Sequence, residues 1–245
     1  RDHPVQSKKY VSGNQPPYVL FDVIKSSFFP GAEPAEDLWE SIESIMPFYN
    51  ENFGVDGARL DMGHALPREL ELRIIEKAKS TDPSFAIIAE ELVMGNDRKA
   101  ADSGYDCILG NTWWMEPRVA EGRLKELVYK VLPGLRIKTL ASVETPDTPR
   151  AVARENGRAF SRFATVLNFF LPNAITYINS GQEIFEIQPM NLGLDNNEEG
   201  RYVLNPNDPF YGKLAFFDHY VLHWNADADM IDLITSLSVL RRENQ

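Results

Sequence analysis

Residues 54–67 read GVDGARLDMGHALP, and this stretch decides the fold. Its middle part is predicted to be a short strand, and Arg59 and Asp61 then share one face because side chains alternate along a strand. Gly63 allows the backbone to turn sharply, and Pro67 suits the first turn of a following helix. A strand that ends in Arg and Asp before a loop is typical of the catalytic end of parallel-barrel enzymes. A purely structural ion pair at a strand end is the alternative.

Strands and helices alternate outward from this stretch. Strands are predicted at residues 18–24, 58–62, 85–89, 105–113, 137–143 and 174–179, and helices at 38–49, 68–80, 97–104, 121–131, 160–171 and 230–242. Residues 1–15 and 184–225 are predicted to be irregular. An α/β fold with parallel strands follows from this alternation.

The spacing of acidic residues at the strand ends indicates a TIM (β/α)8 barrel. Such a barrel uses about 31 residues for each βα unit. Asp61 and Glu90 are 29 residues apart, and Glu90 and Asp147 are 57 apart, which corresponds to one unit and two units. Five units can be counted, so we expect strands four to eight in residues 54–245. Residues 1–53 are expected to be the end of an inserted domain plus one helix, with the first three strands upstream.

Composition limits the classes of partner. A net charge of −11 argues against nucleic acid and anionic membranes as partners. The single cysteine, Cys107, excludes an internal disulfide framework and a cysteine metal cluster, and it fits a reducing, cytoplasmic compartment. Neutral substrates remain open.

Acidic side chains follow three apolar strands, and their chemistry suits the cleavage of glycosidic bonds. Asp61, Glu90 or Glu91, and Asp147 would converge at the mouth of a barrel. Glycosidic cleavage needs one ionised carboxylate and one that holds a proton, so their environments must separate the two pKa values. Strand parity favours Glu90 over Glu91 as the inward group.

Three motifs resemble signature regions of the α-amylase superfamily, glycoside hydrolase family 13. The segment 57–61 matches G-x-R-x-D, residues 88–92 read IAEEL, and residues 144–147 read ETPD. The resemblance implies that Asp61 is the nucleophile, that Arg59 holds it ionised, that Glu90 is the acid/base and that Asp147 binds two sugar hydroxyls. Residues 177–183 are similar to the family's eighth strand with its Gly-Gln-Glu turn.

Two departures from the usual pattern are similar to the maltosyltransferase branch of the family. Pro146 replaces the usual His before Asp147, and His64 stands three residues after Asp61. The implied activity is retaining maltosyl or glycosyl transfer on α-1,4-linked maltodextrins, with phosphate or maltose 1-phosphate as an open possibility for the donor. The same residues also suit a hydrolase that uses water as the acceptor. A fragment without catalytic activity is compatible with the sequence as well.

Further residues complete the expected site. We expect contributions to substrate binding from Arg59, His64, Glu91, Trp113 and Trp114, although a core role for one of the tryptophans is equally compatible with the sequence. His219 and His223 have a spacing that can bind metal on a helix, but no third ligand accompanies them. No metal and no cofactor are expected. A homo-oligomer remains open.

Overall fold

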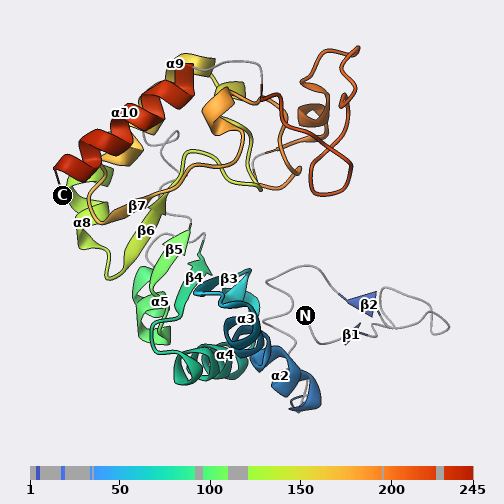
Figure 1. The fold of residues 1–245 in the computed structure, drawn as a ribbon, viewed down its shortest axis with the longest axis vertical. Helices are drawn as coiled ribbons and strands as arrows, with labels where there is room; N and C mark the ends of the chain where they lie inside the picture. The colour runs from blue at the N-terminus through green and yellow to red at the C-terminus, as the bar shows by residue number, and fades with distance from the viewer. Residues whose placement is uncertain are drawn as a thin grey trace. The chain divides into compact units, whose positions relative to one another are not determined.

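The computed structural model describes residues 4–5, 18–19, 34, 36–91, 96–109, 121–194, 196–224 and 229–244. The chain forms two compact units, Arg1–Leu109 and Gly110–Gln245 (Figure 1). The predicted boundary between residues 53 and 54 lies inside the first of them.

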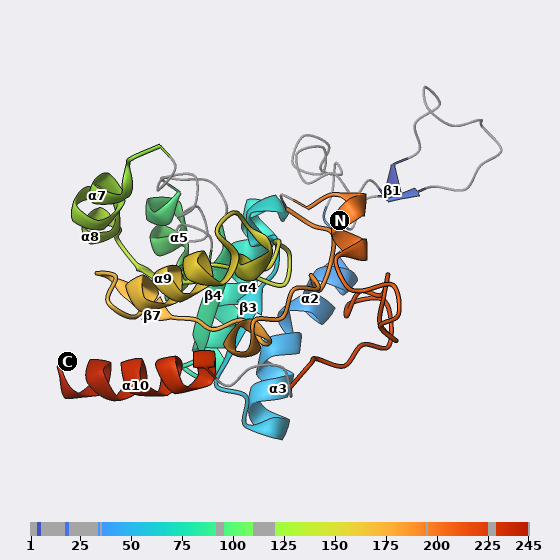
Figure 2. The ribbon, with the colours of Figure 1, turned by 90° about the horizontal axis from the view of Figure 1, so that it is seen from above.

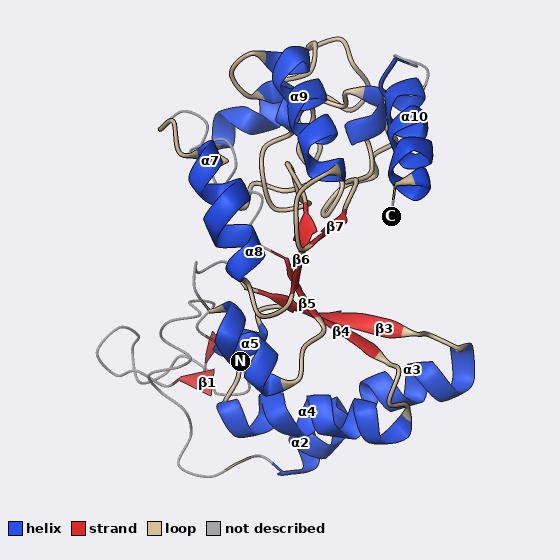
Figure 3. Ribbon diagram, turned by 90° about the vertical axis from the view of Figure 1, so that its left-hand side faces the viewer, coloured by secondary structure: helices blue, strands red, loops and turns tan. Residues whose placement is uncertain are grey.

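The first unit contains parallel strands that alternate with helices. Its elements are β1 (Pro4–Val5), β2 (Tyr18–Val19), α2 (Glu36–Glu43), α3 (Ile45–Phe53), β3 (Gly57–Leu60), η1 (Gly63–Ala65), α4 (Arg68–Thr81), β4 (Ala86–Glu90), α5 (Asp97–Ser103) and β5 (Cys107–Leu109). Strand β4 pairs in parallel with both β3 and β5. Figure 3 shows α2, α3 and α4 grouped beside β3 and β4. The predicted strand–helix alternation is therefore confirmed here.

The beginning of the chain corrects one expectation. Pro4–Val5 was expected to be irregular but pairs antiparallel with Tyr18–Val19. The rest of the strand predicted at 18–24 lies outside the described residues.

The spacing of Leu38, Ile42, Ile45, Met46 and Tyr49 predicts one buried apolar stripe on the helix at 38–49, and this prediction was wrong. The structure has two helical segments, α2 and α3, on either side of Ser44. Trp39 and Met46 are the buried apolar residues, whereas Ile45 and Tyr49 are about half exposed, at 51% and 50%. Both helices pack against α4, which selects a different face from the one that sequence spacing indicated.

Helix α4 buries a different face from the one expected. The spacing of Leu72, Ile75 and Ala78 predicts that these three residues lie on the buried face. Ile75 and Ala78 are buried as predicted, but Leu72 is exposed. Leu70 and Ile74 take its place in the core. The helix starts after Pro67, whose carbonyl accepts a hydrogen bond from the Glu71 amide at 3.0 Å. Pro67 is therefore the N-cap, one residue before the first helical turn in which the sequence had placed it.

The second unit contains two further parallel strands. Its elements are α7 (Leu124–Glu126), η2 (Leu127–Val131), α8 (Leu132–Gly134), β6 (Lys138–Ala141), η3 (Ala151–Ala153), α9 (Gly157–Phe169), β7 (Ala174–Thr176), η4 (Gln182–Ile184), η5 (Glu198–Tyr202) and α10 (Asp229–Glu243). Strands β6 and β7 pair in parallel, with Thr139 opposite Ala174. Helix α9 runs beside β7 and contacts α10 (Figure 2).

A compact apolar core supports β6 and β7. Leu127, Leu132, Ala141, Ala164 and Ala174 are among its buried members. The helix predicted at 121–131 begins at Leu124, and its central turn, η2, is a π-helix.

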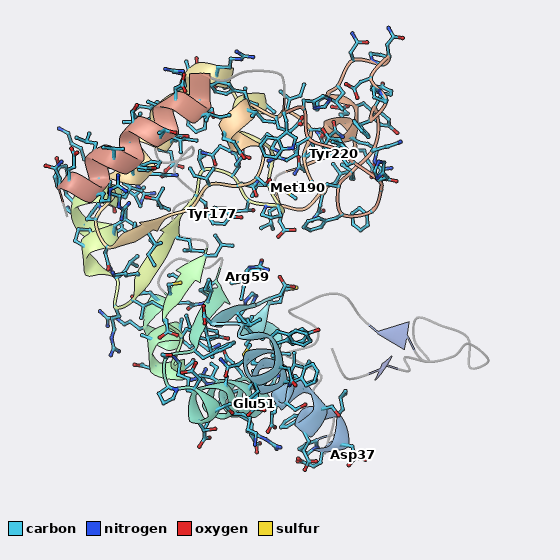
Figure 4. All side chains as sticks on the ribbon, in the orientation of Figure 1. Asp37, Glu51, Arg59, Tyr177, Met190 and Tyr220 are labelled. Atoms are coloured by element: carbon cyan, nitrogen blue, oxygen red, sulfur yellow. The ribbon has the colours of Figure 1, made fainter. Side chains whose placement is uncertain are left out.

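An irregular segment follows β7, as predicted. Apart from the short η5, residues 185–224 contain no helix or strand within the described part. His219 and His223 lie in this irregular chain, and not on a helix, where their spacing of four residues could bind a metal. Figure 4 shows Met190 and Tyr220 on this segment. No helix in the described part of the chain is long and apolar enough to cross a membrane.

Candidate active site

Arg59 and Glu90 are brought together by the register of two parallel strands. Leu60 of β3 lies opposite Ala89 of β4, so the turn that carries Asp61 begins beside Glu90. Nη1 of Arg59 contacts Oδ1 of Asp61 at 2.7 Å, and Nη2 contacts Oε1 of Glu90 at 3.0 Å. One guanidinium group therefore bridges both carboxylates. The period-two pattern of the sequence had placed Arg59 and Asp61 on one face.

The two carboxylates have different surroundings. The Asp61 side chain is 67% exposed, whereas the Glu90 side chain is 8% exposed. Burial raises the pKa of Glu90; Arg59 and the Met62 amide oppose this shift, and the nearby Asp61 carboxylate adds to it. The arrangement gives Glu90 a higher affinity for a proton than an ordinary glutamate has.

A left-handed residue follows Asp61. Met62 has a φ of 48°, and its amide donates a hydrogen bond to Oε2 of Glu90 at 2.8 Å. A positive φ in a residue with a Cβ is uncommon, and such backbone strain clusters at functional sites. The sharp turn therefore lies at Met62 and not at Gly63, where the sequence had indicated it.

Gly63 is required for a different reason. A Cβ at this position would lie 2.4 Å from the Tyr105 hydroxyl and 3.0 Å from Cδ2 of Leu60. The glycine therefore supplies space for close packing, and the left-handed turn is made by the residue before it.

His64 and Glu91 lie on the inner side of the same strand end. Nδ1 of His64 is 3.0 Å from the carbonyl oxygen of Glu90. Glu91 is 4% exposed, and both residues line a small cavity together with Glu71 and Tyr105. The Tyr105 hydroxyl donates to Oε1 of Glu71 at 3.0 Å, and burial raises its pKa. Glu90 lines the same cavity and also contacts Arg59, so both glutamates border this buried polar cluster.

Asp147 belongs to the second unit, in a tight turn after β6. The amide of Thr145 donates to Oγ1 of Thr148 at 2.8 Å, and the amide of Asp147 donates to Oγ1 of Thr145 at 3.2 Å. Oδ1 of the Asp147 carboxylate accepts a hydrogen bond from Nδ2 of Asn191 at 2.5 Å. Sequence reasoning missed Asn191, because it lies in an irregular stretch that no periodicity singles out.

A buried ion pair closes the base of this turn. Nη1 of Arg150 contacts Oε1 of Glu144 at 2.8 Å, and both side chains are 1% exposed. The other carboxylate oxygen accepts from the Ala151 amide at 2.6 Å, and Nε of Arg150 donates to the carbonyl of Gln188 at 2.9 Å. Arg150 thus fastens the irregular segment to the end of β6.

His223 holds the far end of the irregular segment. Its Nδ1 lies 2.8 Å from Oε2 of Glu186, and its Nε2 lies 3.0 Å from Oδ2 of Asp208. Hydrogen bonds with Glu186 and Asp208 raise the pKa of His223 against the opposing effect of burial. The described residues contain no group of three or more metal-ligating side chains that could hold an ion. Trp113 and Trp114 lie outside the described residues.

No known family model matches the sequence, and no curated protein sequence matches it. Solved structures do match. An α-amylase from Anoxybacillus has 16% identity and a TM-score of 0.65, over 85% of this chain and 44% of that one. An α-amylase from Geobacillus thermoleovorans, complexed with acarbose, has 16% identity and a TM-score of 0.65, over 92% of this chain and 50% of that one.

A cyclic α-maltosyl-(1→6)-maltose hydrolase from Arthrobacter globiformis, in complex with maltose, is also similar. It has 16% identity and a TM-score of 0.61, over 86% of this chain and 45% of that one. These likenesses show the fold: the chain has part of the (β/α)8 barrel of α-amylase-type enzymes. It spans half or less of the length of these three structures.

Proposed function

We propose that this chain carries the catalytic carboxylates of a retaining α-glucan-active enzyme of glycoside hydrolase family 13. The observation that carries the proposal is the bridge made by Arg59 between Asp61 and Glu90. Retaining enzymes hold their two carboxyl groups about 5 to 5.5 Å apart, and inverting enzymes hold them further apart to admit a water molecule. Two carboxylates on one guanidinium group fit the shorter spacing.

The roles follow from the two environments. Asp61 is exposed, and its carboxylate contacts the Arg59 guanidinium at 2.7 Å, which suits the nucleophile. Glu90 is buried with a raised pKa, which favours the protonated form that a general acid needs. Arg59 therefore pairs with the proposed nucleophile, while burial raises the proton affinity of the neighbouring Glu90.

The reaction proceeds in two steps. Asp61 attacks the anomeric carbon and forms a glycosyl ester, while Glu90 gives its proton to the leaving sugar oxygen. Glu90, now ionised, removes a proton from the acceptor hydroxyl, which attacks the anomeric carbon and releases Asp61. Asp147 would bind sugar hydroxyls, with Trp113, Trp114, His64 and Glu91 as further substrate-binding candidates.

Maltodextrins with α-1,4 linkages are the proposed substrates, and a second maltodextrin is the proposed acceptor. The Thr145-Pro146-Asp147 sequence favours transfer through its similarity to the maltosyltransferase branch. Hydrolysis is the second candidate, and it is favoured by the names of the matched structures, which include α-amylases and a cyclomaltodextrinase.

Product analysis tests the proposal. The full natural protein that contains these residues is incubated with maltoheptaose, with and without phosphate, and separately with maltose 1-phosphate. Transfer predicts longer and shorter maltodextrins that differ by maltosyl units, whereas hydrolysis predicts shorter products only. Absence of turnover on all of these substrates, by a folded protein, would overturn the proposed function.

A further inference from the structure

The segment around Asn191 is built against the Asp147 turn. Nδ2 of Asn191 donates to Oδ1 of Asp147 at 2.5 Å across 44 residues of sequence. The other oxygen, Oδ2, has no hydrogen-bond partner among the described residues. An ionised carboxylate can accept several hydrogen bonds, so one oxygen is fixed while the other keeps its capacity for a ligand hydroxyl.

The backbone of the same segment also touches Asp147. A Cβ at Gly193 would lie 2.6 Å from the carbonyl oxygen of Asp147 and 3.1 Å from its Cβ. No side chain larger than hydrogen fits there without movement of the turn. The glycine and the asparagine amide therefore constrain the main chain and the side chain of Asp147 together.

The segment is itself fixed by contacts from several directions. The carbonyl of Asn191 accepts from Nδ2 of Asn196 at 3.2 Å, and the carbonyl of Met190 accepts from the Phe216 amide at 3.1 Å. Upstream, the side chain of Gln188 donates to the carbonyls of Arg201 and Lys213. Figure 4 shows Met190, next to Asn191, on the irregular segment. These hydrogen bonds therefore fix the main chain at Asn191 and so hold its side chain beside Asp147.

We propose that Asn191 is a positioning residue that orients the Asp147 carboxylate toward substrate, a role that rests on the proposed function. The residue before Asp147 is Pro146, which has no polar side chain, so the polar support for the carboxylate comes from the later segment. An amide orients one carboxylate oxygen without adding charge, and Oδ2 of Asp147 remains available to accept a hydrogen bond from a sugar hydroxyl.

The kinetic test compares three variants of the full natural protein. Asn191→Leu keeps the approximate shape but removes the donor, and Asn191→Asp keeps the shape but replaces the donor with an acceptor. The matched control is Asn207→Ala, on the same segment, because the Asn207 side chain is exposed. We expect kcat/KM for maltoheptaose to fall about tenfold to a hundredfold in both Asn191 variants, mainly through kcat, and to stay unchanged in the control.

If Asn191 instead stabilised the second unit as a whole, Asn191→Leu would lower the Tm together with the activity. An unchanged kcat in Asn191→Leu, or a loss that matches a drop in Tm, would overturn the proposal. Crystal structures of the wild type and Asn191→Leu provide a second readout that needs no activity. A reoriented Asp147 carboxylate in the variant supports the positioning role, and an unmoved one refutes it.

The two readouts separate the two proposals. A wild-type protein that turns over no glucan refutes the proposed function, while the orientation of Asp147 in the two crystal structures still decides whether Asn191 positions it.

Discussion

The carboxylates of the two units are held in different ways. Asp61 follows β3, and Glu90 is the last residue of the neighbouring parallel strand β4. Arg59 and Met62, which contact Glu90, lie within two residues of Asp61. Asp147 lies in a turn whose carboxylate depends on Asn191, 44 residues away. A strand register brings groups together through regular backbone pairing, whereas an irregular segment does so through individual tertiary contacts such as the Asn191–Asp147 hydrogen bond.

The largest expected effect concerns the strand-held pair. Asp61→Asn should remove nearly all turnover, because an amide can neither attack nor carry the charge. Glu90→Gln should lose roughly 10²–10⁴-fold on maltoheptaose, the usual contribution of general acid catalysis. With a maltosyl fluoride as substrate, Glu90→Gln should reduce the rate of the first step only slightly, because the fluoride leaving group needs no proton.

Burst kinetics with that fluoride measures the first step directly. If the rate of the burst fell equally in Asp61→Asn and Glu90→Gln, this would contradict the assignment of Glu90 as the acid. Arg59 is unsuitable as a control, because it contacts both carboxylates.

The next largest effect concerns the base of the Asp147 turn. Arg150→Met leaves Glu144 buried and without its cation, and removal of one partner of a buried pair costs about 3–5 kcal/mol of unfolding free energy. Arg123→Met is the matched control, because Arg123 pairs with Glu121 and Glu126 at the exposed surface. Urea unfolding measures both, and little change is expected in the control.

An Arg150→Met protein as stable as the wild type would show that the turn does not depend on this ion pair. The Asp147 turn would then not differ from the Asp61–Glu90 pair in needing a distant ion pair for its stability.

The smallest effect concerns His223 and its dependence on pH. Hydrogen bonds to Glu186 and Asp208 raise the pKa of His223 in the folded chain. Its contribution to stability is therefore fully present below the unfolded pKa of about 6.5, and it is lost as pH rises through the higher folded pKa. Hydrogen bonds from His223 and the Gln188 amide lower the pKa of Glu186, so its contribution is lost only as pH falls through that lowered value.

Urea unfolding as a function of pH checks this. His223→Gln should reduce the unfolding free energy by about 1.5 kcal/mol below pH 6, with a smaller difference at pH 9. His219→Gln is the control, since His219 is exposed and has no carboxylate partner among the described residues. A difference that does not vary with pH would contradict the ionic role of His223.

The sequence was informative where geometry is local. Period-two alternation placed Arg59 on the same face as Asp61, and the two side chains are in contact, because this geometry depends only on neighbouring residues. The same reasoning failed for Leu72 and for the helix at 38–49, whose buried faces depend on which other helix packs against them. The face that a helix buries is set by the helices that pack against it, and this can differ from the apolar face that residue spacing predicts.

Three features of the site could not be predicted for a related reason. The left-handed conformation of Met62 arises although methionine has no preference for it. Asn191 and His223 reach their partners through irregular chain, where neither hydrophobic period nor turn composition indicates what lies nearby. The Thr145-Pro146-Asp147 stretch identified the turn, but its support comes from side chains far along the sequence.

The left-handed turn at Met62 links the shape of the main chain to the proton on Glu90. Its amide hydrogen bond favours the ionised form of Glu90 and so opposes the effect of burial on the pKa. Thermodynamic linkage is reciprocal: protonation of Glu90 weakens this hydrogen bond and favours relaxation of the turn. Relaxation would in turn strengthen the hold of Glu90 on its proton. The proton affinity of the proposed acid and the conformation of the residue next to the proposed nucleophile therefore form one coupled equilibrium.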